Sequence, residues 1–195
     1  MSTHERRERE RERRHRLIVT VARELAEAEG WEAVTTRRLA ERIEYSQPVL
    51  YSHFAGKDAI VAAVALEGFA ELTAELGKAR AAAAGPREAL AALIHAYAGF
   101  AGLNPSLYDA MLTLAVDLPF GRPDTPAPLQ AVFAEFREAI AAFAGGRDTG
   151  VLAEVAWGSV HGLVTLTRSG RLPAGHHERR LAMLIDQLAA SADRR

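Results

Sequence analysis

The segment SQPVLYSHF, residues 46–54, surrounds a small apolar pair with hydrogen-bonding side chains. Leu50 and Phe54 are four residues apart, which is the spacing of side chains on the buried face of a helix. The other side chains of the segment would then face outward, and they are Gln47, Val49, Tyr51, Ser52 and His53. A glutamine amide can pair with adenine, and a small apolar group can contact a thymine methyl. Hydroxyl and imidazole groups can donate to phosphates. A helical hairpin that only meets solvent would fit as well, so the residues alone leave both interpretations open.

Two short helices must hold this segment in place. Thr35 and Ser46 stand where each of these helices needs an N-cap. Pro48 falls in the first turn of the second helix, where its missing N–H costs no intrahelical bond. Only residues 44–45 separate the two helices, which is typical of a helix-turn-helix. With the helix that precedes them, they give three helices within residues 9–57.

The rest of the chain has the same helical pattern. Apolar residues recur at steps of three and four among many alanines, and alternating strand patterns are missing. Glycines and prolines divide this part into helices expected at 58–80, 86–102, 104–119, 128–144, 149–169 and 174–192. We therefore predict an all-α protein with a three-helix head, residues 1–57, on a six-helix body, residues 58–195.

Composition excludes several classes of protein. Among 195 residues there is no cysteine, which rules out disulfides, thiolate zinc sites and a cysteine nucleophile. The N-terminus is charged where a signal peptide would be apolar, and no apolar run approaches the roughly 20 residues of a membrane-spanning helix. We expect a cytoplasmic protein without a membrane partner. The formal net charge of −1 gives no indication of a nucleic-acid partner.

The segment GWEAVTTRRLAERIEYSQPVLYSHFAGKDAIVAAV, residues 30–64, resembles the DNA-binding domain of the TetR family of bacterial transcriptional regulators. The matched positions are an aromatic after glycine, Thr-Thr-x-x-Leu-Ala, a Ser-capped second helix, Leu-Tyr-x-His-Phe and Gly-Lys-Asp. The resemblance implies that residues 46–53, including Ser46 and Ser52, enter a major groove of DNA. It also implies that bases are faced by Gln47, Pro48 and Val49. The resemblance implies that the phosphate backbone is faced by Thr36, Tyr51, His53 and Lys57. Arg37 would reach a phosphate or a guanine.

One position departs from the family pattern. Members usually have glycine and a small apolar residue between the two helices, and this chain has Glu44 and Tyr45. Glu44 is therefore expected in a left-handed or otherwise altered conformation.

The first part of the chain is strongly charged. Residues 5–16 hold seven arginines and four glutamates. Several pairs have the i,i+4 spacing, which favours a solvated extension of the first helix; they are Glu5/Arg9, Glu10/Arg14 and Glu12/Arg16. The alternative is an arm that contacts phosphates or the minor groove, and the excess of arginine favours this alternative.

The body carries more aromatic residues than its alanine-rich background, and most are expected in the core. A minority are expected to line a pocket for a small apolar or aromatic effector: Tyr97, Tyr108, Met111, Phe133, Trp157 and His161. For His161 we favour a core histidine with one hydrogen bond over a ligand or metal role. The segment WGSVHG resembles the WHG type of TetR C-terminal domain. In TetR-like proteins the last two helices pair with their symmetry mates, which implies dimerisation through 149–169 and 174–192.

The resemblance thus implies a homodimeric, ligand-responsive repressor that binds a near-palindromic operator and is released by an inducer. No catalytic residue, cofactor or metal is expected, since phosphate loops, HExxH and CxxC are all missing. The alternatives are an activator or a metal sensor of the same fold, and an all-α enzyme or interaction module. Conceivable metal ligands are His95, Asp109, Asp117 and His161.

Overall fold

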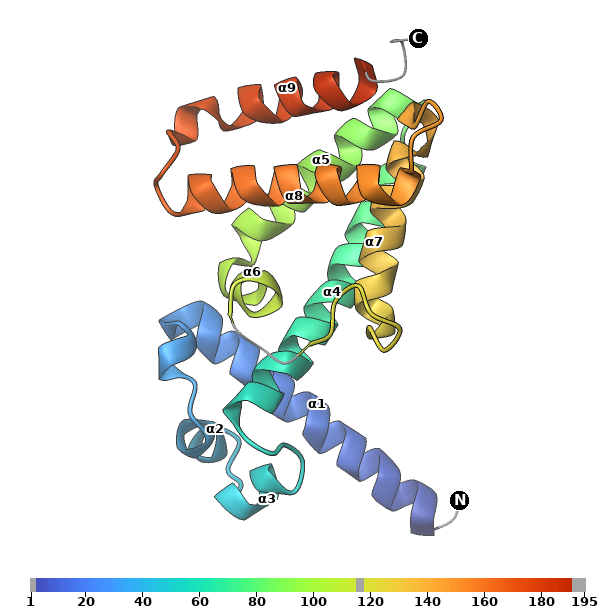
Figure 1. Ribbon diagram of the computed structural model, residues 1–195. Helices are drawn as coiled ribbons and strands as arrows, with labels where there is room; N and C mark the ends of the chain where they lie inside the picture. The colour runs from blue at the N-terminus through green and yellow to red at the C-terminus, as the bar shows by residue number, and fades with distance from the viewer. Residues whose placement is uncertain (1–2, 115–117, 191–195) are drawn as a thin grey trace. The chain divides into compact units, whose positions relative to one another are not determined.

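The structure is a computed structural model that describes residues 3–114 and 118–190 (Figure 1). These residues contain nine α-helices, three 3-10 turns and no β-strand, which confirms the predicted all-α class. The N-terminal helices are α1 (Thr3–Glu29), η1 (Trp31–Ala33), α2 (Thr36–Arg42), α3 (Gln47–Tyr51) and α4 (Lys57–Ala81). The helices that follow are α5 (Pro86–Leu103), α6 (Pro105–Leu112), α7 (Ala127–Ile140), η2 (Ala141–Phe143), α8 (Thr149–Arg168), η3 (Ala174–His176) and α9 (His177–Ala189).

The connection between α2 and α3 has the predicted local features. The Thr35 side chain caps α2 by accepting a hydrogen bond from the backbone N–H of Arg38 at 3.2 Å. Ser46 occupies the N-cap position of α3, but within the described residues its hydroxyl caps no backbone N–H. Glu44 has φ 57°, the left-handed conformation expected at this position. Among the described residues it is the only one other than glycine with a positive φ.

Three predicted helix ends differ from the structure. Helix α4 begins at Lys57, so Asp58 lies in its first turn and not at its cap. Helix α6 ends at Leu112, which makes it shorter than the predicted helix 104–119. Part of that predicted helix, residues 115–117, lies outside the described residues. Helix α1 begins at Thr3, nearly two turns before residue 9, because the charged N-terminal residues continue the helix. The other predicted helices agree with the structure to within about one turn.

The chain divides into two compact units. One contains residues 1–68 and 104–122, and the other contains residues 69–103 and 123–195. Helix α4 therefore contributes residues to both units, and α6 joins α1, α2 and α3 in the first unit. This division follows the packing of the chain. The predicted boundary between a DNA-binding head, residues 1–57, and a body, residues 58–195, concerns function and stays a prediction.

Helix α6 is tied to α1 and η1 by hydrogen bonds within the first unit. The Glu27 carboxylate accepts from the backbone N–H groups of Ser106 and Leu107, at 3.2 and 2.9 Å. The Ser106 hydroxyl donates to the carbonyl of Ala26 at 2.9 Å, and the Trp31 indole N–H donates to the Ser106 carbonyl at 2.7 Å. A side chain of α1 thus satisfies the orphan N–H groups that open α6.

Glycine permits the close approach of α4 to α6. A Cβ placed on Gly68 would lie 2.7 Å from atoms of the Leu107 and Met111 side chains, closer than any relaxed contact. Both side chains belong to the buried face of α6. Gly68 therefore lets the backbone of α4 approach the α6 side chains directly, and any larger residue would displace them.

Candidate DNA-contact surface and effector cluster

One side of helix α3 packs against the core, and its other side is exposed. Leu50 is 1% exposed and Phe54 is 6% exposed, so the predicted buried pair is confirmed. The outward side chains of the segment are exposed or half-buried: Gln47, Pro48, Val49, Tyr51, Ser52 and His53. These six positions form what we call the α3 surface. Their arrangement agrees with the sequence analysis, whereas their contacts with bases stay a prediction.

Helix α2 places further polar groups at the edge of the α3 surface. The Thr36 hydroxyl lies 3.5 Å from the Tyr51 hydroxyl, so two of the groups predicted to face the backbone are adjacent. The Arg37 guanidinium is bonded to the Glu41 carboxylate at 2.9 Å. Both side chains are largely exposed, and an exposed pair of this kind contributes little to stability. Arg37 can therefore exchange Glu41 for a phosphate at low cost.

Lys57 already has a partner in the structure. Its ammonium group donates to the backbone carbonyl of Trp31 at 2.6 Å, which ties the start of α4 to η1. An ammonium has three donors, so this bond leaves two hydrogens for a phosphate. The sequence predicts only the phosphate contact and gives no sign of this structural bond, because the carbonyl partner is 26 residues away.

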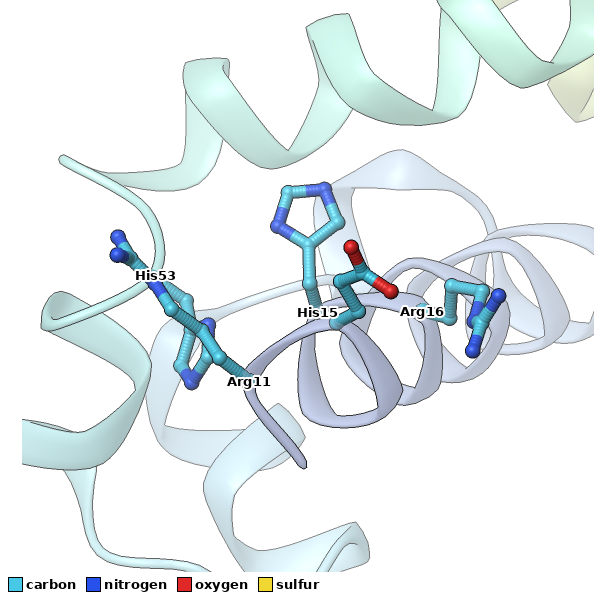
Figure 2. A pocket seen from close by; sticks show the side chains of 5 residues that line it. Arg11, His15, Arg16 and His53 are labelled. Atoms are coloured by element: carbon cyan, nitrogen blue, oxygen red, sulfur yellow. The ribbon is translucent and has the colours of Figure 1, made fainter. Parts of the chain in front are cut away.

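The charged N-terminal part of α1 lies beside the end of α3. The His15 ring stacks on the Phe54 ring with centroids 4.4 Å apart, and the His53 ring lies 6.5 Å from His15. Arg11 and His53 both line a cleft of about 270 Å³ between these segments (Figure 2). Burial lowers the pKa of His53, and the positive charges of Arg11, His15 and Arg14 lower it further.

In the second unit the structure brings together four of the predicted effector residues. The Trp157 indole N–H donates to the Tyr97 hydroxyl at 3.1 Å, and that hydroxyl lies 3.4 Å from Nδ1 of His161. The Phe133 and Trp157 ring centroids are 6.4 Å apart. Phe136, which the sequence analysis did not select, packs edge-on against Tyr97 at 5.7 Å. We call these five residues the aromatic cluster.

The aromatic cluster gives His161 an environment that fits a core histidine. Its Nε2 lies 3.5 Å from the Thr165 hydroxyl, so both ring nitrogens have a polar neighbour. Burial lowers the pKa of His161, and the charge of Arg168 lowers it further, which favours the neutral imidazole. The other two predicted effector residues, Tyr108 and Met111, are buried on α6 in the first unit.

The conceivable metal ligands do not gather in the described part of the chain. There, no group of three or more His, Asp or Glu side chains is placed to hold a metal ion. His95 instead pairs with Glu178 at 3.5 Å, and Asp109 lies 3.4 Å from the Thr113 hydroxyl. Asp117 falls outside the described residues.

Helices α8 and α9 lie side by side in the second unit (Figure 1) and present an apolar surface. A Cβ added to Gly158 or Gly162 would meet no atom within 4 Å, so this stretch of α8 is open. A groove of about 450 Å³ runs beside the two glycines. Four large apolar side chains are exposed on these helices: Val151, Val155, Leu166 and Met183. We call these residues and the two glycines the α8/α9 surface.

Two family models match the chain. Residues 18–64 match the model of bacterial regulatory proteins of the tetR family. Residues 90–191, more than half of the chain, match the model of the tetracyclin repressor-like C-terminal domain. The chain belongs to the TetR family. The predicted membership is confirmed, and with it the class of helix-turn-helix transcriptional regulators.

Known TetR-like proteins are similar to this TetR-family chain over different lengths. It is 34% identical over 97 residues to the HTH-type transcriptional regulator YobS of Bacillus subtilis, which is half of each chain. It is 48% identical over 48 residues to the class C tetracycline repressor protein of Escherichia coli, 25% of this chain and 22% of that one. The chain thus spans half or less of the length of these curated relatives.

A solved structure covers more of the TetR-family chain. A protein of unknown function from Rhodococcus sp. RHA1 superimposes with a TM-score of 0.72 at 26% identity, covering 90% of this chain and 93% of that one. The fold is thus shared over both compact units. Among the described residues, no helix is long and apolar enough to cross a membrane.

Proposed function

We propose that this TetR-family regulator is a ligand-responsive repressor that binds a near-palindromic operator as a homodimer. The observation that carries the proposal is the α3 surface, whose hydrogen-bonding side chains are held outward by the buried pair Leu50 and Phe54. One α3 enters a major groove in each half-site, and Gln47 and Val49 read base edges there with Pro48. The phosphate backbone is contacted by Thr36, Arg37, Ser46, Tyr51, Ser52, His53 and Lys57.

The α8/α9 surface supports the homodimer. Contiguous apolar side chains exposed on a monomer mark an interaction site, and the open glycines let a facing helix approach closely. Two copies of this surface can pack against each other across a two-fold axis, since such an interface uses the same patch on both subunits. That axis requires two inverted half-sites, with centres about one helical turn of DNA apart or a multiple of it.

The aromatic cluster supports a small apolar or aromatic effector. Its rings supply an apolar wall, while the Tyr97 hydroxyl and the His161 imidazole supply polar tips that can orient a bound molecule. We propose that the effector favours an arrangement of the dimer in which the two α3 surfaces no longer match the operator. Its difference in affinity for the two arrangements is the entire coupling free energy. Helix α4, which contributes residues to both units, is the proposed connection.

Selection from a random duplex pool tests this function. Purified protein without effector should recover a near-palindromic site at near-cellular ionic strength, and small molecules are then screened for release of that site. Placing the recovered site over a reporter promoter distinguishes repression from activation. A protein that prefers no duplex over heparin contradicts the proposal.

The metal-sensing alternative has its own test. The protein is dialysed against zinc, and the bound metal is then determined by elemental analysis. Stoichiometric zinc, together with release of the recovered duplex by zinc, would replace the organic effector by a metal. Substoichiometric zinc would contradict the metal-sensing alternative and support an organic effector. We propose no catalytic activity, since the family is one of transcriptional regulators.

A further inference from the structure

The charged N-terminal part of the chain is a helix, continuous with the packed part of α1. Ile18 and Leu25 mark the side of α1 that faces the core, and both are fully buried. The same side, followed toward the N-terminus in steps of four, three and four residues, carries Arg14, Arg11 and Arg7. The stripe that is apolar against the core thus becomes basic where α1 extends past it.

This basic stripe and the end of α3 form two sides of a cleft of about 660 Å³. Arg6, Arg7, Arg11 and Arg14 line it from α1, and Ser52 and His53 line it from the turn that directly follows α3. Both Arg7 and Arg11 are exposed, so their guanidinium groups are available to a partner. The cleft therefore continues the α3 surface with a row of arginines.

Arg14 has a different role in the same cleft. Its guanidinium is bonded to the Glu10 carboxylate at 3.1 Å and lies over the Tyr45 ring, 5.9 Å from the centroid. Glu10 also lines the cleft, but its charge is paired with Arg14. Arg14 thus fixes α1 beside the α2–α3 connection, and the charge that projects outward comes from Arg7 and Arg11.

The charges around the cleft combine into a positive potential. The positive charges of Arg11, His15 and Arg14 all act on the His53 imidazole and lower its pKa, in addition to the effect of burial. Glu12 lines the neighbouring cleft and offsets part of this charge. A group with negative charge placed at the end of α3 would be attracted by several residues at once.

We propose that Arg7 and Arg11 bind DNA phosphates beside the bases that α3 reads. The inference rests on the proposed function and extends its DNA-contact surface by about one turn of α1, the turn that carries Arg7 and Arg11. It also distinguishes between the two DNA contacts expected for a charged arm, which are the phosphates and the minor groove. A helix with its side chains is about 10–12 Å wide, whereas the minor groove of B-DNA is about 6 Å wide. A helical arm therefore lies along the phosphates and does not enter the minor groove.

A matched pair of double variants tests this contact. Arg7→Ala/Arg11→Ala removes two positive charges from the cleft side of α1. Arg9→Ala/Arg13→Ala removes the same charge from the opposite side of the same helix, and both of its residues are exposed. Each protein is titrated with the duplex recovered by selection, and with an unrelated duplex of equal length, over a series of KCl concentrations. Circular dichroism checks that each variant remains helical.

The cleft variant should show a shallower dependence of log K on log [KCl], by about 0.9 for each phosphate that the protein no longer neutralises. The control variant should keep most of the wild-type slope. The recovered base preference should be the same in all three proteins, because phosphate contacts carry no direct sequence information.

Equal slopes for the two variants would overturn the inference, whether both slopes change or neither does. Equal changes would mean general attraction by a charged helix, and no change would mean a solvated extension. A wild-type protein that recovers no preferred duplex would contradict the proposed function instead. The unrelated duplex would then still test the two arginines.

Discussion

The α3 surface and the α8/α9 surface are both exposed, but their chemistry differs. The α3 surface mixes a proline and a valine with amide, hydroxyl and imidazole groups on a helix of five residues and the turn that follows it. The α8/α9 surface combines glycines with valine, leucine and methionine on helices of 20 and 13 residues. Donors and acceptors at defined positions suit a partner with polar edges and charges, whereas exposed apolar side chains beside open glycines suit a second copy of the same surface.

The largest effect should follow from charge on the α8/α9 surface. Val155→Glu/Met183→Glu places carboxylates at positions that are 53% and 55% exposed. In a two-fold interface each carboxylate would be buried near its symmetry mate, so the dimer should dissociate. Operator affinity should fall about 100-fold, which is about 2.7 kcal/mol. Sedimentation velocity and an operator titration measure the two effects.

The control for this variant introduces the same charge elsewhere. Leu103 at the end of α5 is 84% exposed and lies on neither α8 nor α9, so Leu103→Glu should leave dimer and operator affinity unchanged. A dimeric Val155→Glu/Met183→Glu protein would place the interface on another surface.

A second prediction concerns one side chain of the α3 surface. Gln47→Ala should cost about 1–3 kcal/mol on the operator and relax base preference at one position in each half-site. Tyr51→Phe removes only a hydroxyl and should weaken binding to all sequences alike. Repeated selection with each variant measures both outcomes. Identical recovered sites and equal losses of affinity would contradict the division into base and phosphate contacts.

Lys57→Ala should also weaken binding to all sequences alike. Because the ammonium group holds the Trp31 carbonyl, this variant should in addition lower the free energy of unfolding by about 1 kcal/mol. Thermal denaturation separates this loss of stability from the weaker binding to phosphate. An unchanged stability would mean that solvent replaces the lysine without cost.

The turn before α3 offers a smaller, stabilising change. Glu44→Gly should raise the free energy of unfolding by about 0.5–1 kcal/mol, because glycine adopts a φ of 57° without the clash of a Cβ. Glu41→Gly removes the same charge inside α2 and should lower the free energy of unfolding by about 1 kcal/mol. Denaturant titration gives the sign of each change. Dimerisation should be unaffected in both, since neither residue belongs to the α8/α9 surface.

The smallest effect is a dependence of stability on pH. His161 and His53 both have a pKa below the ordinary value of 6.5, so the folded protein binds fewer protons than the unfolded chain just below pH 6.5. Stability should therefore fall as the pH drops below 6.5, and His161→Gln should reduce that slope. The exposed His4→Gln is the control. A slope that His161→Gln leaves unchanged would mean that the pKa of His161 is not lowered.

Operator binding should have the opposite dependence on pH. A phosphate beside His53 favours the protonated imidazole against the charges of Arg11, Arg14 and His15 that surround it. Operator affinity should therefore increase as the pH falls toward 6, and His53→Gln should remove part of the increase while His161→Gln should not. Fluorescence titrations at several pH values measure this difference between the two histidines.

The α3 surface was predictable because its determinants are local in the sequence. The Thr35 cap, the buried pair Leu50 and Phe54 and the left-handed Glu44 each depend on residues within one or two turns. The basic stripe of α1 is also present in the sequence, because its arginines continue the helical spacing that begins at Ile18. Seven arginines among four glutamates nevertheless indicate only a charged helix until one side is known to face α3.

Contacts between distant segments could not be predicted in the same way. Glu27 and Ser106 are 79 residues apart, and neither type nor spacing indicates that a carboxylate of α1 caps α6. Helical periodicity identifies a buried tyrosine, but it does not assign the residue to a core. The sequence therefore predicts one pocket for Tyr97 and Tyr108; the structure assigns the two residues to different compact units, and their shared pocket stays a prediction.

The attachment of α6 to α1 limits how this regulator can be cut and recombined. A fragment that stops at residue 57 or 68 would leave the Glu27 carboxylate and the Trp31 indole N–H without their protein partners. It would also expose the apolar side chains that meet α6. A chimera that borrows the DNA-contact surface for another sensor therefore has to carry residues 104–112 as well, or a designed replacement with two N–H groups aimed at that carboxylate.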